Sequence, residues 1–133
     1  MLDLSALVNA IARLQEGVDT YARDPSQSLI RDGLVQRFEF TYEISHKMLK
    51  RYLEGVSATP GQYDNMPFQD LIRSGNEQGL LRGDWPQWRA YRDMRARTSH
   101  TYEETVALAV VQGIPAFLDE ARALCAQLQQ RQS

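Results

Sequence analysis

The feature that most constrains the fold is the stretch of residues 26–55, which contains no proline and repeats with the period of an α-helix. Side chains that suit a helix interface recur there every three or four positions, which indicates one continuous helix. One stripe consists of Ile30, Leu34, Phe38, Thr41, Ser45, Met48 and Tyr52, and the stripe beside it consists of Val35, Tyr42, Leu49 and Leu53. Because two adjacent stripes need cover, this helix must pack against neighbours on two sides.

Shorter helical patterns lie on both sides of this stretch. Apolar residues between Leu4 and Tyr21 predict a first helix, which ends near residue 23 because an Asp-Pro pair follows. After a loop rich in glycine, proline and asparagine, Pro67 in the first helical turn predicts a short helix over residues 68–79.

Two more helices complete the pattern. Asp84 is a candidate N-cap for a helix over residues 84–96, with a proline in its first turn. Thr101 and Glu104 have the spacing of a capping box, which predicts the start of a fifth helix. We expect Gly113 and Pro115 to kink that helix, because proline removes a backbone donor and crowds the preceding turn.

No segment alternates apolar and polar residues as a strand does. A chain of 133 residues, of which 43% are hydrophobic, is large enough to bury one core. We therefore predict an all-α helical bundle that forms one domain over residues 1–133.

Composition narrows the function classes. The formal net charge of −2 argues against a generally basic nucleic-acid-binding domain, so any contact with a nucleic acid must be local. The one cysteine, Cys125, lies in an apolar helical context that predicts a buried, unreactive thiol. The N-terminus lacks the basic start of a secretory signal, and no apolar run reaches the roughly 18–20 residues of a membrane span. These features predict a soluble, cytoplasmic protein without membrane contact.

Common enzyme motifs are absent. The chain has no phosphate-binding loop, no nucleophile elbow and no zinc-type cluster of cysteine and histidine. Its two histidines, His46 and His100, are far apart in sequence and have no evident co-ligands. We expect neither a metal site nor a cofactor.

The long helix also has a polar face, which contains Glu39, Glu43, His46 and Lys50. The simpler interpretation is a solvated face on which Glu43 pairs with Lys47, and the alternative is that its carboxylates contribute to a site. Aromatic and sulfur side chains recur in steps of three at Trp85, Trp88, Tyr91 and Met94. Core packing is the simpler interpretation of these four, and a platform for stacked bases is the alternative.

The segment that points to chemistry is the junction RARTSHTYEET, residues 95–105. Four arginines within nine residues lead to His100, and these are Arg89, Arg92, Arg95 and Arg97. Histidine can take a proton from an attacking hydroxyl group or give one to a leaving oxygen. Arginine donates hydrogen bonds to phosphate oxygens as negative charge builds on them, and a nearby helix start helps to hold an anion. The pattern fits phosphodiester chemistry, and the spacing alone fits an exposed polar junction between helices as well.

The same junction resembles the signature of the HEPN domain family, which is an arginine, four to six residues, a histidine and often a tyrosine two positions later. In this sequence these residues are Arg95, His100 and Tyr102. The stretch VQRFEFTYEISHKMLKRYLE, residues 35–54, is similar to the long helix of the nucleotidyltransferase substrate-binding branch of that family. Together the two matches span the middle of the chain, residues 35–105.

This resemblance implies an antiparallel bundle of about five helices, of the four-helix up-and-down type. It also implies a homodimeric, metal-independent endoribonuclease toxin whose antitoxin is a minimal nucleotidyltransferase encoded nearby. Arg95 would contact the RNA phosphate, His100 would act as acid and base, and Tyr102 would accept AMP from the antitoxin, which silences the toxin. Supporting or RNA-binding roles would fall to Glu43, Arg92, Arg97, Thr98 and Ser99.

Two positions depart from the family pattern. Ala96 stands where a polar residue such as asparagine is common, and His46 stands where an aromatic residue is common. Ala96 cannot hydrogen-bond a phosphate or orient His100, which favours a second hypothesis, a non-catalytic substrate-binding subunit of a nucleotidyltransferase. A plain helical adaptor, in which residues 97–102 only cap a helix, is the third hypothesis.

Overall fold

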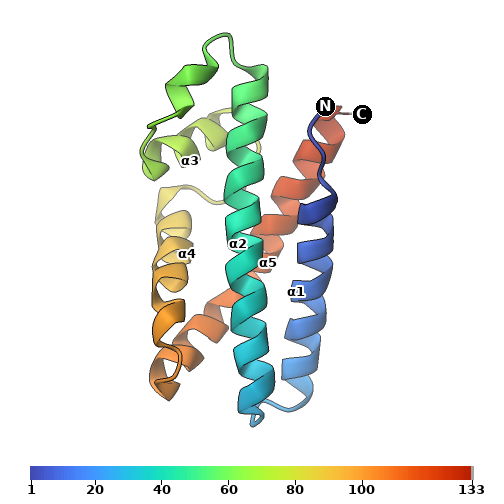
Figure 1. The fold of residues 1–133 in the computed structure, drawn as a ribbon, viewed down its shortest axis with the longest axis vertical. Coiled ribbons are helices and arrows are strands. Elements are labelled where there is room, and N and C mark those ends of the chain that lie inside the picture. The colour runs from blue at the N-terminus through green and yellow to red at the C-terminus, as the bar shows by residue number, and fades with distance from the viewer. Residues whose placement is uncertain (133) are drawn as a thin grey trace.

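The computed structural model describes residues 1–132, and within them the chain forms five α-helices and two 3-10 turns (Figure 1). The helices are α1 (Ser5–Arg23), α2 (Ser28–Val56), α3 (Phe68–Glu77), α4 (Trp85–Arg97) and α5 (Glu104–Gln132), and the 3-10 turns span Pro60–Tyr63 and Thr98–His100. No strand occurs among these residues. The predicted all-α class is confirmed.

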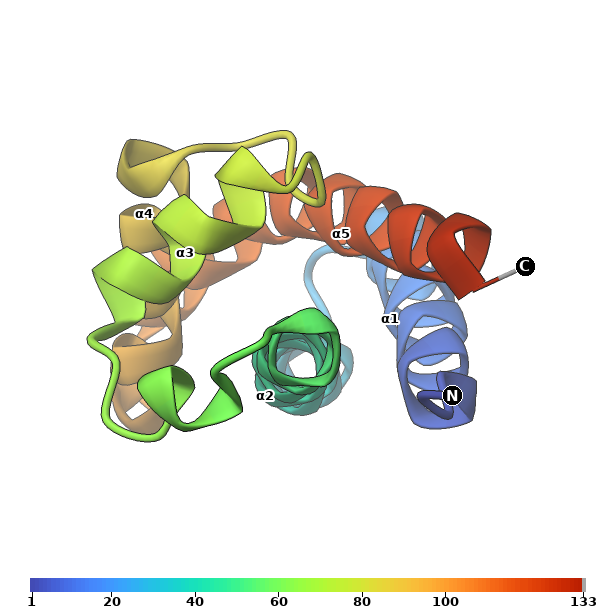
Figure 2. The same ribbon diagram turned by 90° about the horizontal axis from the view of Figure 1, so that it is seen from above.

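The long helices pack side by side. α1 and α2 run antiparallel, and α5 returns to the end of the bundle where the chain begins (Figure 1). There the Leu2 amide donates to Gln132 Oε1 at 2.8 Å, and Gln132 Nε2 donates to the Leu2 carbonyl at 3.0 Å. Seen from above, α2 lies between α1 and the α3–α4 pair, with α5 extending from α4 to α1 (Figure 2). α2 is therefore covered on two sides, as its two stripes predict.

Most helix boundaries agree with the sequence signals. α1 ends at Arg23, and α4 begins after Asp84, whose amide donates to Gln87 Oε1 at 3.1 Å as in a capping box. Pro67 lies at the N-cap position of α3, one residue before the predicted first turn.

The predicted capping box at the start of α5 is wrong. Thr101 has the helix-like dihedral angles φ −76° and ψ 0°, and its hydroxyl donates to the Thr98 carbonyl at 3.1 Å. The reason is that the chain leaves α4 through a tight 3-10 turn, which places a carbonyl three residues back within reach of the Thr101 hydroxyl. α5 begins at Glu104 and continues as one helix through Pro115.

Gly113 lies where α4 and α5 approach closely. A Cβ atom at this position would lie 2.5 Å from Met94 Sδ and 2.8 Å from Met94 Cε. The missing side chain therefore makes room for Met94, which packs on the core from α4.

An aromatic cluster forms the centre of the bundle. The rings of Phe38 and Phe117 meet edge to face with centroids 5.1 Å apart, and Tyr91 lies 5.3 Å from Phe117. Trp88 is fully buried and lies 5.4 Å from Tyr91. Trp88 and Tyr91 therefore serve packing, the simpler of the two interpretations of the aromatic repeat.

One buried carboxylate fixes this centre to the start of α4. Glu120, on α5, is 4% exposed and accepts a hydrogen bond from Trp88 Nε1 at 2.8 Å. It also accepts from the Gly83 amide at 3.0 and 3.2 Å. Both carboxylate oxygens have donors, so burial of this polar side chain is compensated.

Two further sequence predictions concern Cys125 and membrane-spanning helices. Cys125 is buried on α5, and burial raises the pKa of its thiol, which disfavours the reactive thiolate. Among the described residues, no helix combines the length and the apolar character needed to cross a membrane.

Candidate functional site

The RARTSHTYEET junction lies where α4 ends, opposite the middle of α2. α4 passes into the Thr98–His100 turn, and a short connection then leads to Glu104 and α5. This turn contacts α2, α4 and α5. The candidate site is therefore built from the end of one helix, a tight turn and the side of the long helix.

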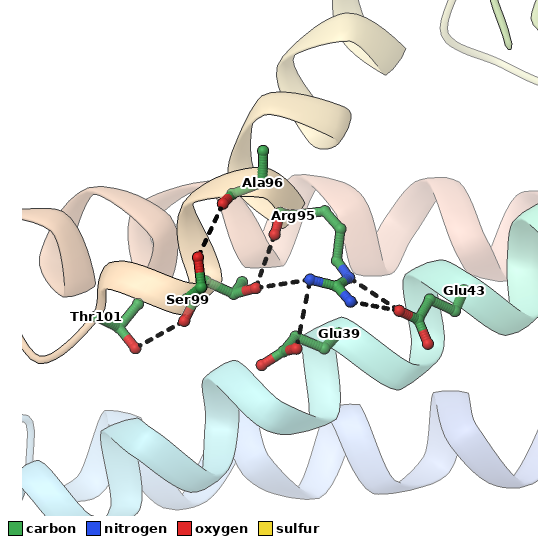
Figure 3. A network of polar contacts seen from close by, with 7 residues as sticks. Glu39, Glu43, Arg95, Ala96, Ser99 and Thr101 are labelled. Carbon is green, nitrogen blue, oxygen red and sulfur yellow. Dashed lines mark hydrogen bonds and ion pairs between the residues drawn. The ribbon is translucent and has the colours of Figure 1, made fainter.

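Arg95 joins α4 to α2. Its Nε donates to Glu43 Oε1 at 3.1 Å, and its Nη2 binds the same oxygen (Figure 3). On the other side, Arg95 Nη1 lies 3.4 Å from Glu39 Oε2. The hydrogen bond to Glu43 is the main reason why the pKa of Arg95 is raised above its ordinary value. The guanidinium is held in place and keeps its positive charge.

Thr98 ties the guanidinium to the end of its own helix. Arg95 Nη1 donates to Thr98 Oγ1 at 3.0 Å, and that hydroxyl donates to the Arg95 carbonyl at 2.7 Å. Thr98 is 6% exposed, so its hydroxyl is screened from water. Ser99 is exposed, and its hydroxyl donates to the Ala96 carbonyl at 3.5 Å (Figure 3).

His100 and Tyr102 face solvent. Tyr102 is 81% exposed, and its ring meets the His100 ring edge-on with centroids 6.2 Å apart. Within residues 1–132, His100 makes no hydrogen bond or ion pair with Arg95. One chain thus brings His100 to Tyr102 and Arg95 to Thr98 and the glutamates, as two adjacent groups.

The other arginines of the junction differ in their surroundings. The Arg92 guanidinium lies 5.2 Å from the Trp85 ring centroid and 5.9 Å from that of Phe68, which is a cation–π arrangement. Arg97 is exposed and forms no ion pair in the described part of the chain. Arg92 is therefore held against aromatic rings, whereas Arg97 is free to meet a ligand.

The simpler interpretation of the polar face predicts an ion pair between Glu43 and Lys47. This prediction is wrong for the described chain. Glu43 pairs with Arg95, because α4 packs across this face of α2 and a guanidinium lies closer than the lysine four residues along. Glu39 belongs to the same cluster, which agrees with the alternative interpretation that carboxylates of the polar face contribute to a site.

His46 lies away from the junction. Its ring is half-buried and meets Phe68 edge-on with centroids 4.8 Å apart. Burial is the main reason that its pKa is lowered, and the charge of Lys50 adds to the effect. His46 therefore packs against an aromatic ring and takes no part in the junction.

Two residues near the junction had no functional role in the sequence interpretation. Tyr42 is buried beneath the arginines of α4, and burial raises its pKa to about 12 despite the nearby charges of Arg92 and Arg95. Arg31, whose side chain is 13% exposed, lies 3.9 Å from Glu104 at the start of α5. The sequence gives neither residue a functional signal, because their neighbours on α4 and α5 are set by the packing of α2 against those helices.

Known proteins are similar to this chain in sequence and in fold. A probable ribonuclease HepT of Haemophilus influenzae is 39% identical over 138 residues, which cover 98% of this chain and 94% of that protein. The solved structure of HI0074, also from Haemophilus influenzae, was described as the fold of a substrate-binding domain of a nucleotidyltransferase. It superposes with a TM-score of 0.89 and 36% identity over 96% of this chain and 99% of its own.

A second solved structure, of a protein from Thermus thermophilus, has a TM-score of 0.72 and 31% identity, and the match covers 92% of this chain and 98% of the other. The family model described as nucleotidyltransferase substrate binding protein like matches residues 2–130. The chain therefore belongs to the nucleotidyltransferase substrate-binding proteins, a branch of the HEPN domain family.

Proposed function

We propose that this protein is a metal-independent endoribonuclease, the toxin of a pair whose antitoxin is a minimal nucleotidyltransferase. The observation that carries the proposal is the arrangement at the end of α4. A fixed arginine, Arg95, is followed shortly by an exposed histidine, His100, and by Tyr102, which is 81% exposed. Similarity to a probable ribonuclease over nearly the whole chain supports the same conclusion.

In the proposed reaction, His100 takes the proton of an RNA 2′-hydroxyl group, whose oxygen attacks the adjacent phosphorus. A 2′,3′-cyclic phosphate forms, the bond to the 5′-oxygen breaks, and that oxygen receives a proton from a histidine in its protonated form. Arg95 donates hydrogen bonds to the phosphate oxygens as their negative charge increases. Arg92, Arg97 and Ser99 would bind the flanking RNA.

The proposal includes a homodimer. A two-fold axis near the α4 end would place two copies of Arg95 and His100 around one cleft, because an isologous interface presents the same surface twice. Paired arginines would also give a chain of net charge −2 a local basic surface for RNA.

Silencing would occur at Tyr102. The partner would transfer AMP from ATP, so that the Tyr102 hydroxyl oxygen forms a bond to the α-phosphorus, pyrophosphate leaves and the phenol proton passes to a base of the partner. The exposure of Tyr102 supports this step, since the hydroxyl can enter another protein's active site. The added phosphate would lie beside His100 and repel an RNA phosphate.

Cleavage of a single-stranded RNA by the parent protein and by His100→Ala tests the catalytic assignment. We expect a loss of about 10²- to 10⁴-fold, the usual contribution of an acid–base residue, with unchanged helical circular dichroism. His46→Phe is the matched control, because it removes the other histidine and keeps an aromatic ring against Phe68. Equal cleavage by a folded His100→Ala variant would contradict the assignment.

A second candidate function is a non-catalytic subunit that presents Tyr102 to a nucleotidyltransferase. Two features favour it: Ala96 has no polar side chain, and Arg95 is occupied by Glu39 and Glu43. This alternative predicts a stable complex and AMP transfer that disappears in Tyr102→Phe, without RNA cleavage by the free protein. Cleavage that depends on His100 would decide against it.

A further inference from the structure

The guanidinium of Arg95 is engaged on both sides in the free protein. Its Nε and Nη2 atoms bind one oxygen of Glu43, and its Nη1 atom faces Thr98 Oγ1 at 3.0 Å and Glu39 at 3.4 Å (Figure 3). Arginine binds phosphate best through two parallel N–H groups, and Nε with Nη2 is such a pair. The edge of Arg95 most suited to a phosphate already holds a carboxylate.

The contacts on the two sides of the guanidinium are not equally stable. Thr98 is 6% exposed and its hydroxyl also binds the Arg95 carbonyl, so this contact is part of the helix end. The Glu43 side chain is 58% exposed, against 34% for Glu39. Exposed ion pairs contribute little because water competes for both partners. The Glu43 contact is therefore the one that a ligand can exchange.

The net charge of the cluster opposes phosphate binding at Arg95 unless Glu43 moves away. One guanidinium between two carboxylates leaves the cluster with a formal charge of −1, which repels a phosphate. If a phosphate takes the place of Glu43, the cation stays aligned by Thr98 and Glu39. The incoming anion then gains the paired donors without disturbing the helix end.

We propose that Glu43 is a built-in competitor for the substrate phosphate. It holds the Nε and Nη2 edge of Arg95 in the free protein and yields that edge to a phosphate of single-stranded RNA. The inference rests on the proposed function, since it takes RNA as the ligand. Glu43 then governs RNA affinity, whereas Glu39 and Thr98 position Arg95 for the reaction.

Binding of a 2′-O-methyl RNA tests this inference, because the methyl group blocks attack by the 2′-oxygen and keeps the strand intact. Fluorescence anisotropy with a labelled single strand of mixed sequence gives the Kd of each variant. We expect Glu43→Gln to bind about two- to five-fold more tightly, which corresponds to loss of one exposed competing ion pair. With cleavable RNA, the same variant should lower KM.

The matched control is Glu54→Gln, which removes the same charge from the same helix. Glu54 lies eleven residues beyond Glu43, so it shares that face of α2, and it forms no ion pair in the described chain. We expect this variant to change Kd less than Glu43→Gln does. In an Arg95→Gln background, Glu43→Gln should have no larger effect than Glu54→Gln.

Equal effects of the two glutamine variants would overturn the inference, as would weaker binding by Glu43→Gln or a gain that survives in Arg95→Gln. RNA binding that depends on Arg95 but not on Glu43 removes only this inference. Absence of binding, or binding indifferent to Arg95→Gln, removes the proposed function and the inference with it. Circular dichroism of each variant confirms that it is folded.

Discussion

The aromatic centre of the bundle and the end of α4 use their polar groups in opposite ways. At the centre, Glu120 is 4% exposed and both of its oxygens are bound by donors from Trp88 and Gly83. At the end of α4, Tyr102 is 81% exposed and His100 is also exposed, and within residues 1–132 no hydrogen bond fixes the His100 ring.

The difference separates stability from function. A buried carboxylate with all its donors supplied fixes one arrangement of α4 against α5, and any change there leaves a polar group unpaired. Exposed groups that are not needed for folding remain able to meet a substrate or a partner. The centre should therefore respond to mutation through stability, and the end of α4 through RNA cleavage and modification.

The largest effect on stability is expected at the centre. Trp88→Ala removes a fully buried ring and one donor to Glu120, which should lower the free energy of unfolding by about 3–5 kcal/mol. Urea denaturation measures the loss. Trp85→Ala, at a partly buried position of the same helix, should cost less. Equal losses would show that the centre is no more sensitive than the helix surface.

Gly113→Ala sharpens the comparison at the boundary between the two regions. The new Cβ would overlap Met94 Sδ, which is the far end of a flexible side chain, so Met94 can shift at modest cost. We expect Gly113→Ala to be about 1 kcal/mol less favourable for the free energy of unfolding than its control. Gly33→Ala is the matched control, because nothing lies within 4 Å of its Cβ position and α2 should gain about 0.5–1 kcal/mol. In a Met94→Ala background the cost of Gly113→Ala should shrink, and an unchanged cost would contradict the overlap.

Arg95→Ala measures how much the site contributes to the fold. It removes the contacts to Thr98 and to two carboxylates that are partly exposed, and should lower the free energy of unfolding by about 0.5–1.5 kcal/mol. Arg97→Ala, at an exposed position without an ion pair in the described chain, should change it by less than about 0.5 kcal/mol. A loss for Arg95→Ala as large as that for Trp88→Ala would erase the distinction between the regions.

The smallest effect concerns pH. The pKa of folded His46 is lowered below its ordinary value of 6.5, so under acidic conditions the unfolded chain binds the proton more readily. The stability contributed by neutral His46 is therefore complete above pH 6.5 and declines as the pH falls below it. His46→Phe should remove this part of the decline. Urea midpoints of both proteins at about pH 8 and pH 5.5 test this, and parallel pH profiles would contradict it.

The fold could be read from the sequence because the helices are long and their apolar faces regular. Two stripes on α2 predicted two packing partners, and Asp84 marked the start of α4 correctly. The cap at Thr101 was mispredicted because the backbone conformation of the Thr98–His100 turn, which decides the acceptor, leaves no pattern in the sequence.

The site was harder to predict, for a physical reason. The sequence of the junction pointed to Arg95, His100 and Tyr102. The carboxylates that hold Arg95, however, come from α2, about fifty residues earlier in the chain. Local spacing favoured a Glu43–Lys47 pair, and tertiary packing replaced it with Glu43–Arg95. The roles of these residues, the homodimer and the antitoxin partner remain predictions.

The measurement that tests the central claim most directly is intact-mass analysis of this protein after incubation with the minimal nucleotidyltransferase, ATP and Mg²⁺, with RNA cleavage assayed before and after. We predict a mass gain of one AMP unit on Tyr102 and loss of a cleavage activity that the free protein has. The gain should be absent in Tyr102→Phe. A stable complex without a mass gain, from a protein that never cleaves RNA, would contradict the toxin assignment and leave the end of α4 as a docking surface.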